Sequence, residues 1–279
     1  GMRILVVEDN QINQQVAEEL LNCEGAVVSL AANGQLGVDA VRFANPQFDV
    51  VLMDLQMPVM DGFTATRTIR EQLGLRALPV IAMTANAMDS DRDDCLSAGM
   101  NAHVGKPFNL NVLVKTLLNH CQPGVKNQAQ ACEGSAVEPT PAPAATLPGQ
   151  PSGIDLAGAL DRLSGMASLY LRAAKEFVKV IPTVMEEFMP LLHADSKRAT
   201  MQMHSLKGNA AMLGATALTE LTGQLEKMCK SGSTVDEISV QLPHLERTLH
   251  ATLMDLQAVI GQLEPVSYTH LRAHETVLD

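Results

Sequence analysis

A proline-rich stretch near the middle of this 279-residue sequence limits what the chain can fold into, because it separates two parts with different periodicities. Residues 123–153 contain six Pro, four Gly and six Ala. The Pro-x-Pro-x-Pro run that begins at Pro139 cannot continue a helix or a central strand. We therefore expect a semi-flexible linker, which as a coil spans roughly 30 Å. Its position and the chain length predict two domains, over residues 1–122 and 154–264.

Short apolar runs alternate with segments of helical pattern throughout residues 1–122. Continuous apolar runs are typical of buried parallel strands, and their alternation with helices predicts β-α-β units. We expect an α/β fold, with a doubly wound sheet of five parallel strands covered on both faces. The predicted strands are Arg3–Val7, Ala26–Ala31, Val50–Met53, Pro79–Met83 and Ala102–Val104. The predicted helices include Ile12–Cys23, Gly37–Phe43, Phe63–Gln72 and Asn109–His120.

Residues 154–264 lack strand-like alternation, and apolar residues recur there at helical spacing. This pattern predicts an all-α domain, with four or five antiparallel helices in a bundle. Residues 265–279 resemble translated vector sequence, so we interpret them as a non-native tail and leave them out of the fold prediction. One predicted apolar stripe is Leu169, Ala173, Phe177 and Val180, and another is Leu245, Leu249, Leu253, Leu256 and Ile260.

Composition excludes several classes of function. The formal net charge is −11 and no segment is basic, which argues against a nucleic-acid partner. Trp is absent and aromatic residues make up only 3% of the chain, so base-stacking surfaces are not expected. No apolar run reaches the length of about 18 residues that a membrane span needs. The five cysteines are scattered and odd in number, which favours a reducing cytoplasm over a disulfide framework or a zinc site.

Charged and polar residues stand where several predicted strands end. Glu8 and Asp9 follow the first strand, Asp54 the third, Thr84 the fourth and Lys106 the fifth. Each alone is more often a helix cap or a turn residue, but the carboxyl ends of parallel strands meet at one edge of a sheet. Three carboxylates in one pocket suit Mg²⁺, and a free carboxylate can attack phosphorus. Thr84 and Lys106 can then contact the phosphoryl oxygens, so the set predicts phosphoryl transfer.

These residues lie in motifs that resemble those of the response-regulator receiver domain. The motifs Leu5–Asn10, Leu52–Gly62, Met83–Ala85 and Lys106–Pro107 occur in order, and the resemblance covers residues 2–120. It implies that Asp54 is the phospho-acceptor and that the Lys106–Pro107 peptide bond is cis. It also implies that Thr84 and Lys106 contact the phosphoryl group. The implied Mg²⁺ ligands are Glu8, Asp9, Asp54 and the backbone carbonyl of Gln56.

The second domain contains a histidine in an unusual helical context. A lone histidine is more often a surface residue, but His204 is followed by Lys207 and Gly208 on one face of a predicted helix. A neutral imidazole can attack phosphorus, and a lysine one turn away can balance the phosphoryl charge. A glycine inside a helix lets a partner surface approach closely. The core face of this helix is predicted to be Met203, Leu206, Ala210 and Leu213.

The stretch around His204 resembles the histidine-containing phosphotransfer (Hpt) domain, whose signature is His-Ser/Thr-Leu-Lys-Gly. The match spans roughly residues 154–263. The resemblance implies that His204 is a second phospho-acceptor and that Lys207 assists it. Together the two domains predict a phosphorelay. Asp54 accepts a phosphoryl group from a kinase phosphohistidine and exchanges it with His204, which passes it to a downstream response-regulator receiver.

The sequence contains no Gly-rich nucleotide lid and no phosphate loop, so we expect a phosphotransfer module without an ATP-binding kinase core. We interpret the chain as the C-terminal part of a hybrid sensor histidine kinase. The kinase core then lies upstream in the parent chain, which can be anchored in the inner membrane. A free-standing receiver–phosphotransfer protein is the second interpretation.

Two other functions remain as alternatives. One is a phosphorylation-independent docking module, which the complete set of receiver residues disfavours. The other is an Asp-nucleophile phosphatase of the haloacid-dehalogenase type. Such enzymes need a second Asp two residues after the nucleophile, where this sequence has Gln56.

Overall fold

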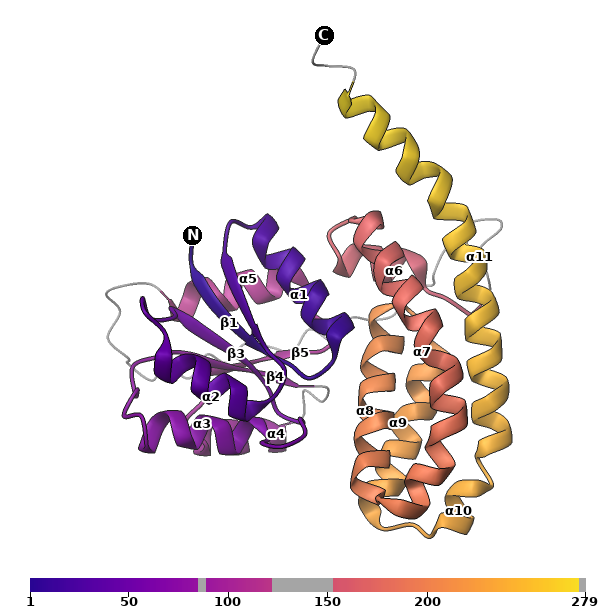
Figure 1. Cartoon of the computed structure of the whole chain (residues 1–279), viewed down its shortest axis with the longest axis horizontal. Helices are drawn as coiled ribbons and strands as arrows, with labels where there is room; N and C mark the ends of the chain where they lie inside the picture. The colour runs from indigo at the N-terminus through magenta and orange to yellow at the C-terminus, as the bar shows by residue number, and fades with distance from the viewer. Residues whose placement is uncertain (85–88, 122–152, 276–279) are drawn as a thin grey trace.

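The computed structural model describes residues 1–84, 89–121 and 153–275. These residues form two bodies that lie side by side, a layered α/β domain and a bundle of long helices (Figure 1). The predicted linker lies outside the described residues except for Gly153. The predicted domain limits, 1–122 and 154–264, therefore stay predictions.

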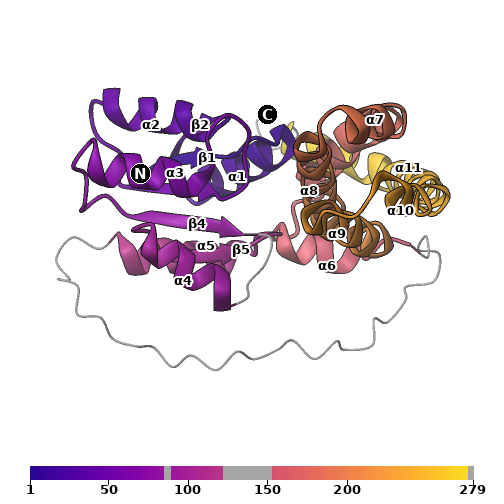
Figure 2. The same cartoon turned by 90° about the horizontal axis from the view of Figure 1, so that it is seen from below.

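The first domain is a sheet of five parallel strands in the order β2-β1-β3-β4-β5, as predicted. Helices cover both faces, and α1 lies on the side of the sheet that faces the bundle (Figures 1 and 2). The strands are β1 (Arg3–Val7), β2 (Val27–Ala31), β3 (Val50–Asp54), β4 (Val80–Thr84) and β5 (Ala102–Gly105). The helices are α1 (Gln11–Cys23), α2 (Gly34–Phe43), α3 (Gly62–Glu71), α4 (Asp89–Ser97) and α5 (Leu110–His120).

Successive side chains of β1 point to opposite faces of the sheet, because side chains alternate along a strand, and they are buried on both faces. Ile4 and Val6 pack in the core under α1 and α5, whereas Leu5 and Val7 pack in the core under α2 and α3. Burial on both faces explains the continuous apolar run in the sequence. The polar residues that follow the strands are thereby placed at one edge of the sheet.

Helix α2 begins three residues earlier than predicted, at Gly34 instead of Gly37. The side chain of Asn33 caps it by accepting a hydrogen bond from the backbone N–H of Leu36 at 2.9 Å. Gly37 lies inside this helix for a steric reason. A Cβ atom at this position would lie 2.8 Å from a methyl group of Val7, so glycine lets α2 pack closely on β1.

The second domain is all-α, and four long helices form its bundle, as predicted (Figure 1). Two short helices accompany them within the described residues. The helices are α6 (Leu156–Arg162), α7 (Ala167–Ala194), α8 (Ser196–Met212), α9 (Thr216–Ser231), α10 (Val235–Ser239) and α11 (Leu242–Glu275).

Helix α11 differs from the expectation that the fold ends at residue 264. The helix continues to Glu275, so residues 265–275 extend the last helix of the bundle. Pro265 removes one backbone hydrogen bond of this helix, but residues 266–275 contain neither Gly nor Pro and so do not interrupt it further. The non-native origin of this tail stays a prediction.

The predicted stripe of α7 is wrong at its last member. Leu169, Ala173 and Phe177 are all buried, but 39% of Val180 is exposed. Ile181, which follows Phe177 by four residues, takes the core position and is 1% exposed. A period of 3.6 residues permits either continuation, so the sequence pattern alone could not choose between them.

We expect Tyr170→Phe to destabilise the bundle. Tyr170 is fully buried, and its hydroxyl donates a hydrogen bond of 3.1 Å to the backbone carbonyl of Leu213 just after α8. The substitution leaves this buried acceptor without its donor, which costs about 1–2 kcal/mol. Urea unfolding of the whole chain checks this, with the helical signal as readout. An unchanged or higher midpoint for the bundle would contradict the role given to the hydroxyl.

The Lys106–Pro107 peptide bond is cis, as the family resemblance implies. Within the described residues, none of the helices combines the length and hydropathy that a membrane span requires.

Candidate functional site

The edge of the sheet gathers the acidic residues predicted from the strand ends. Carboxylate oxygens of Glu8, Asp9 and Asp54 lie within 4.8 Å of one another. The Nζ atom of Lys106 lies 2.5 Å from Glu8 Oε2 and 2.7 Å from Asp54 Oδ2. Thr84 is buried at the end of β4, in the same cavity wall as Asp54. The parallel topology therefore brings all five predicted residues to one place.

Charge within this cluster is unbalanced, since one lysine faces three carboxylates. Burial raises the pKa of Glu8 to about 7; Lys106 opposes this shift and the charge of Asp54 adds to it. Burial and the charge of Asp54 also raise the pKa of Asp9. The pKa of Lys106 lies above its ordinary value although burial alone would lower it, because Asp54 and Glu8 stabilise its charge. A further cation would relieve the repulsion between the carboxylates.

The first turn of α1 holds the acidic cluster in place. Asn10 caps the helix by accepting hydrogen bonds from the backbone N–H groups of Ile12 and Asn13. The side-chain amide of Asn13 then donates to Glu8 Oε1 at 3.0 Å. Sequence reasoning missed Asn13. Its signal was its position in the first turn of a helix that starts directly after the two acidic residues.

Gln56 connects the acidic cluster to the bundle. Its backbone N–H lies 3.4 Å from Asp54 Oδ1. Its side-chain oxygen accepts a hydrogen bond of 3.1 Å from Lys230 of α9. The predicted use of its backbone carbonyl as a metal ligand stays a prediction.

His204 lies on α8, which begins at the side-chain cap of Asp195. The predicted core face of this helix is buried, and His204 itself is only 8% exposed. Its Nδ1 atom lies 2.9 Å from Oε1 of Glu226 on α9. Glu226 also contacts Lys207 Nζ at 3.2 Å and Lys230 Nζ at 2.6 Å. His204 and the predicted assisting lysine thus share one buried carboxylate.

Glu226 fixes which nitrogen of His204 carries the proton. Burial alone would raise the pKa of Glu226, but hydrogen bonds from His204 and Lys230 hold it well below its ordinary value. An ionised carboxylate can only accept hydrogen bonds, so Nδ1 of His204 must donate. The Nε2 atom of the neutral ring is then left with its lone pair.

Sequence reasoning did not find Glu226 or Lys230. They lie 22 and 26 residues after His204 and belong to another helix, so no local motif joins them to it. The available signal was weak. Glu226 shares the buried face of α9 with Leu218 and Leu225, where an acidic residue needs a partner.

The two clusters open onto one cavity of about 240 Å³ between the domains. Both predicted phospho-acceptors line it, one from the end of β3 and one from α8. The three lysines that line it all come from the bundle. Its lining includes Asp54, Gln56, Thr84, His204, Lys207, Glu226, Lys227 and Lys230.

Comparison with known families explains why these two clusters occur in one chain. The family model "Response regulator receiver domain" matches residues 4–118, and the model "Hpt domain" matches residues 172–263. The chain carries a receiver domain followed by an Hpt domain. This combination confirms the predicted fold classes and places the chain in phosphorelay signal transduction.

Curated relatives share the same order of segments. Sensor protein GacS of Pseudomonas syringae pv. syringae is 30% identical over 270 residues, which cover 94% of this chain and 27% of GacS. Signal transduction histidine-protein kinase BarA of Shigella flexneri is 27% identical over 262 residues, which cover 94% of this chain and 28% of BarA. The chain therefore spans less than a third of the length of either relative.

One similar solved structure is the receiver domain of a sensor histidine kinase from Pseudomonas aeruginosa PAO1, which has a magnesium ion coordinated in its active-site cleft. It is 44% identical, covers 43% of this chain and 98% of its own, and aligns with a TM-score of 0.40.

Proposed function

We propose that Asp54 of the receiver domain accepts a phosphoryl group from a kinase phosphohistidine and exchanges it with His204 of the Hpt domain. His204 then passes the group to the receiver domain of a separate response regulator. The single observation that carries this proposal is that both side chains line the same cavity between the domains. The parent chain is proposed to be a protein histidine kinase, in keeping with the names of relatives that this chain matches over 94% of its length.

The exchange between the domains needs a nucleophile on one side and a leaving carboxylate on the other. The Nε2 lone pair of His204 attacks the phosphorus of the Asp54 acyl phosphate. A P–N bond forms, the P–O bond to Asp54 breaks, and its electron pair restores the carboxylate. The ring of His204 keeps its Nδ1 proton and gains a positive charge, which the carboxylate of Glu226 at 2.9 Å stabilises. The reverse reaction uses the same groups.

Lysines supplied by both domains favour a negative phosphoryl group in the cavity. Lys106 lies beside Asp54, and Lys207 and Lys230 lie beside Glu226. In a largely buried site these charges stabilise the transferring group more strongly than they would in water. Thr84 adds a hydroxyl to the same cavity wall. We propose these residues, with Asp54 and His204, as the transfer machinery.

The acidic cluster fits Mg²⁺, because it offers three carboxylates within 4.8 Å and only one neutralising lysine. Glu8, Asp9, Asp54 and the backbone carbonyl of Gln56 would hold the ion. When bound, Mg²⁺ offsets negative charge on the phosphoryl oxygens.

Removal of divalent ions is expected to slow the labelling of Asp54 strongly. Without a cation, the acidic cluster repels the incoming phosphoryl group. With a radiolabelled phosphohistidine kinase core as donor, EDTA should lower the initial labelling rate by more than about tenfold, and excess Mg²⁺ should restore it. Ca²⁺, a larger ion with more flexible coordination, serves as the control. If neither EDTA nor Mg²⁺ changed the initial labelling rate, the proposed metal site would be excluded.

The chemical stability of the label tests the assignment of the two acceptors. An acyl phosphate on Asp54 is labile in base, whereas a phosphohistidine is labile in acid and stable in base.

We also propose that the module lies in the cytoplasm. Free thiols at the four cysteines among the described residues (Cys23, Cys95, Cys121 and Cys229) support this location.

A further inference from the structure

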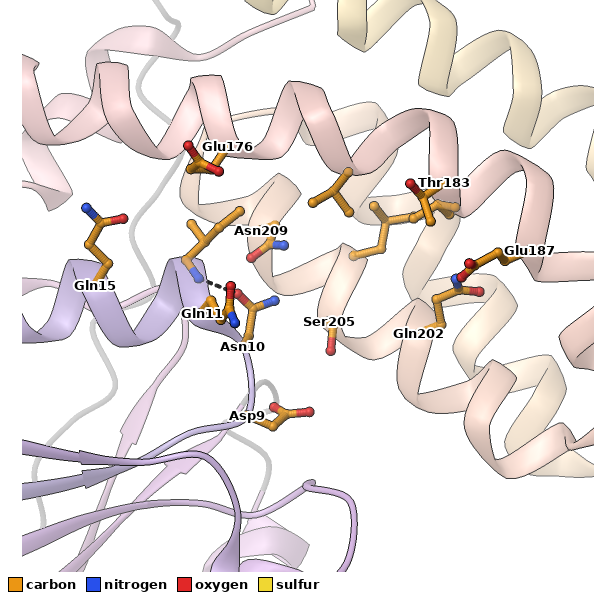
Figure 3. A pocket seen from close by; sticks show the side chains of 14 residues that line it. Asp9, Asn10, Gln11, Gln15, Glu176, Thr183, Glu187, Gln202, Ser205 and Asn209 are labelled. Carbon is orange, nitrogen blue, oxygen red and sulfur yellow. Dashed lines mark hydrogen bonds between the residues drawn. The ribbon is translucent and has the colours of Figure 1, made fainter. Parts of the chain in front are cut away.

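The receiver domain packs on the Hpt domain through an apolar contact between α1 and the helices α7 and α8. Ile12 of α1 is 6% exposed, and it belongs to the same buried cluster as Val184 of α7 and Leu206 of α8. Figure 3 shows the start of α1 facing α7 and α8 across a cavity of about 530 Å³, with Gln11 and Asn10 on one side and Asn209 and Ser205 on the other. The cavity shows that this apolar contact is incompletely packed. The apolar side chains alone therefore do not select one partner domain.

Polar contacts on either side of the apolar contact are more specific. Glu19 of α1 forms an ion pair with Arg172 of α7. Lys230 of α9 donates to the side chain of Gln56 beside Asp54. A Cβ atom at Gly208 would lie 3.7 Å from the side chain of Asn13, so the surface that approaches this glycine belongs to the chain's own receiver domain.

We propose that the Glu19–Arg172 ion pair directs the receiver domain onto the Hpt domain of its own chain, so that the phosphoryl group passes within one chain. This inference rests on the proposed function. It has a second consequence, because His204 is only 8% exposed in the docked arrangement. A separate receiver reaches His204 only after the chain's own receiver has moved away.

The tether favours docking within the chain. Residues 123–153 join the two domains covalently, so the domains meet at an effective concentration of about a millimolar, well above that of a second copy in solution. Glu19 and Arg172 have side chains that are 26% and 51% exposed, so each is accessible to an outside partner when the domains separate. Opposite charges at these positions attract the domains, and like charges would repel them.

The experiment redirects transfer from one chain to another by reversing charges in full-length chains. The plain donor is His204→Gln, labelled at Asp54 by a phosphohistidine kinase core that is then removed. The plain acceptor is Asp54→Asn. The redirected pair adds Arg172→Glu to the donor and Glu19→Arg to the acceptor. Within each of these chains the charges now repel, while the donor's Glu19 and the acceptor's Arg172 still attract each other.

The redirected pair should transfer label to His204 of the acceptor about fivefold faster than the plain pair, as expected for two partly exposed charge contacts. A mismatched pair, with Glu19→Arg added to both donor and acceptor, also loses docking within each chain but has like charges between the chains, so it should transfer more slowly than the redirected pair. The matched controls Glu18→Arg in the acceptor and Lys179→Glu in the donor reverse the same charges on the same helices. Lys179 pairs with Glu176 inside the Hpt domain, so this control pair should behave like the plain pair.

A redirected pair that is no faster than the control pair would overturn the docking proposal. Failure of the proposed function looks different, because label would then never reach His204 in the unaltered chain. Labelling of Asp54 is measured in every donor first, so that a loss of folding is not mistaken for a loss of docking.

Discussion

Asp54→Asn is expected to abolish base-labile labelling of the chain and to leave its fold intact. The amide has nearly the same shape as the carboxylate but is not a nucleophile, so the phosphohistidine donor finds no acceptor in the receiver domain. We expect labelling by the kinase core to fall by more than about a hundredfold. Lys106 keeps its contact of 2.5 Å with Glu8, so the buried lysine retains an anionic partner.

The same substitution at Asp39 is the control, because this residue pairs with Arg42 on the surface of α2, away from the acidic cluster. Asp39→Asn should be labelled like the unaltered chain. Circular dichroism establishes whether both variants are folded. Base-labile label at an undiminished rate in Asp54→Asn would show that another carboxylate is the acceptor.

His204→Gln is expected to stop the relay after its first step. Asp54 keeps its surroundings in the receiver domain, so its initial labelling rate should be unchanged. The glutamine amide can still donate to Glu226, which preserves the buried hydrogen bond but supplies no lone pair to attack phosphorus. Label that is stable in base and labile in acid should fall by more than about a hundredfold.

His250→Gln on α11 is the matched control for this variant, because His250 is exposed. It should form phosphohistidine like the unaltered chain. If base-stable label accumulated normally in His204→Gln, the Hpt acceptor would have to be a different histidine.

The acidic half of the site could be predicted from the sequence because topology determines it. Once the apolar runs are recognised as parallel strands, Asp54 and Thr84 must lie at the same edge as Glu8. Lys106 follows β5 and reaches the same edge. The order of the parallel strands alone places these residues together.

The histidine half could be predicted only in part. His204 and Lys207 share one helix and are joined by spacing, but Glu226 comes from α9 and is placed by the packing of two helices. Helix α4 was missed for a related reason. The sequence from Asp89 to Ser97 carries few apolar residues and no clear amphipathic pattern, so its helical form was not evident from periodicity.

Docking between the domains was beyond sequence reasoning. The Glu19–Arg172 pair joins residues 153 positions apart. In the sequence, each belongs to a helix face with the pattern of an ordinary exposed face. Val180 illustrates the same limit. Its exposure on α7 makes sense only when the cavity that it shares with α1 is known.

The most direct test of the phosphorelay is a labelling time course on the unaltered chain. The chain is incubated with Mg²⁺ and a radiolabelled phosphohistidine kinase core, and each sample is divided between acid and base treatment. We predict base-labile label first, which requires Asp54, followed by acid-labile and base-stable label, which requires His204. Label that remains base-labile throughout the time course would contradict transfer from the receiver domain to the Hpt domain.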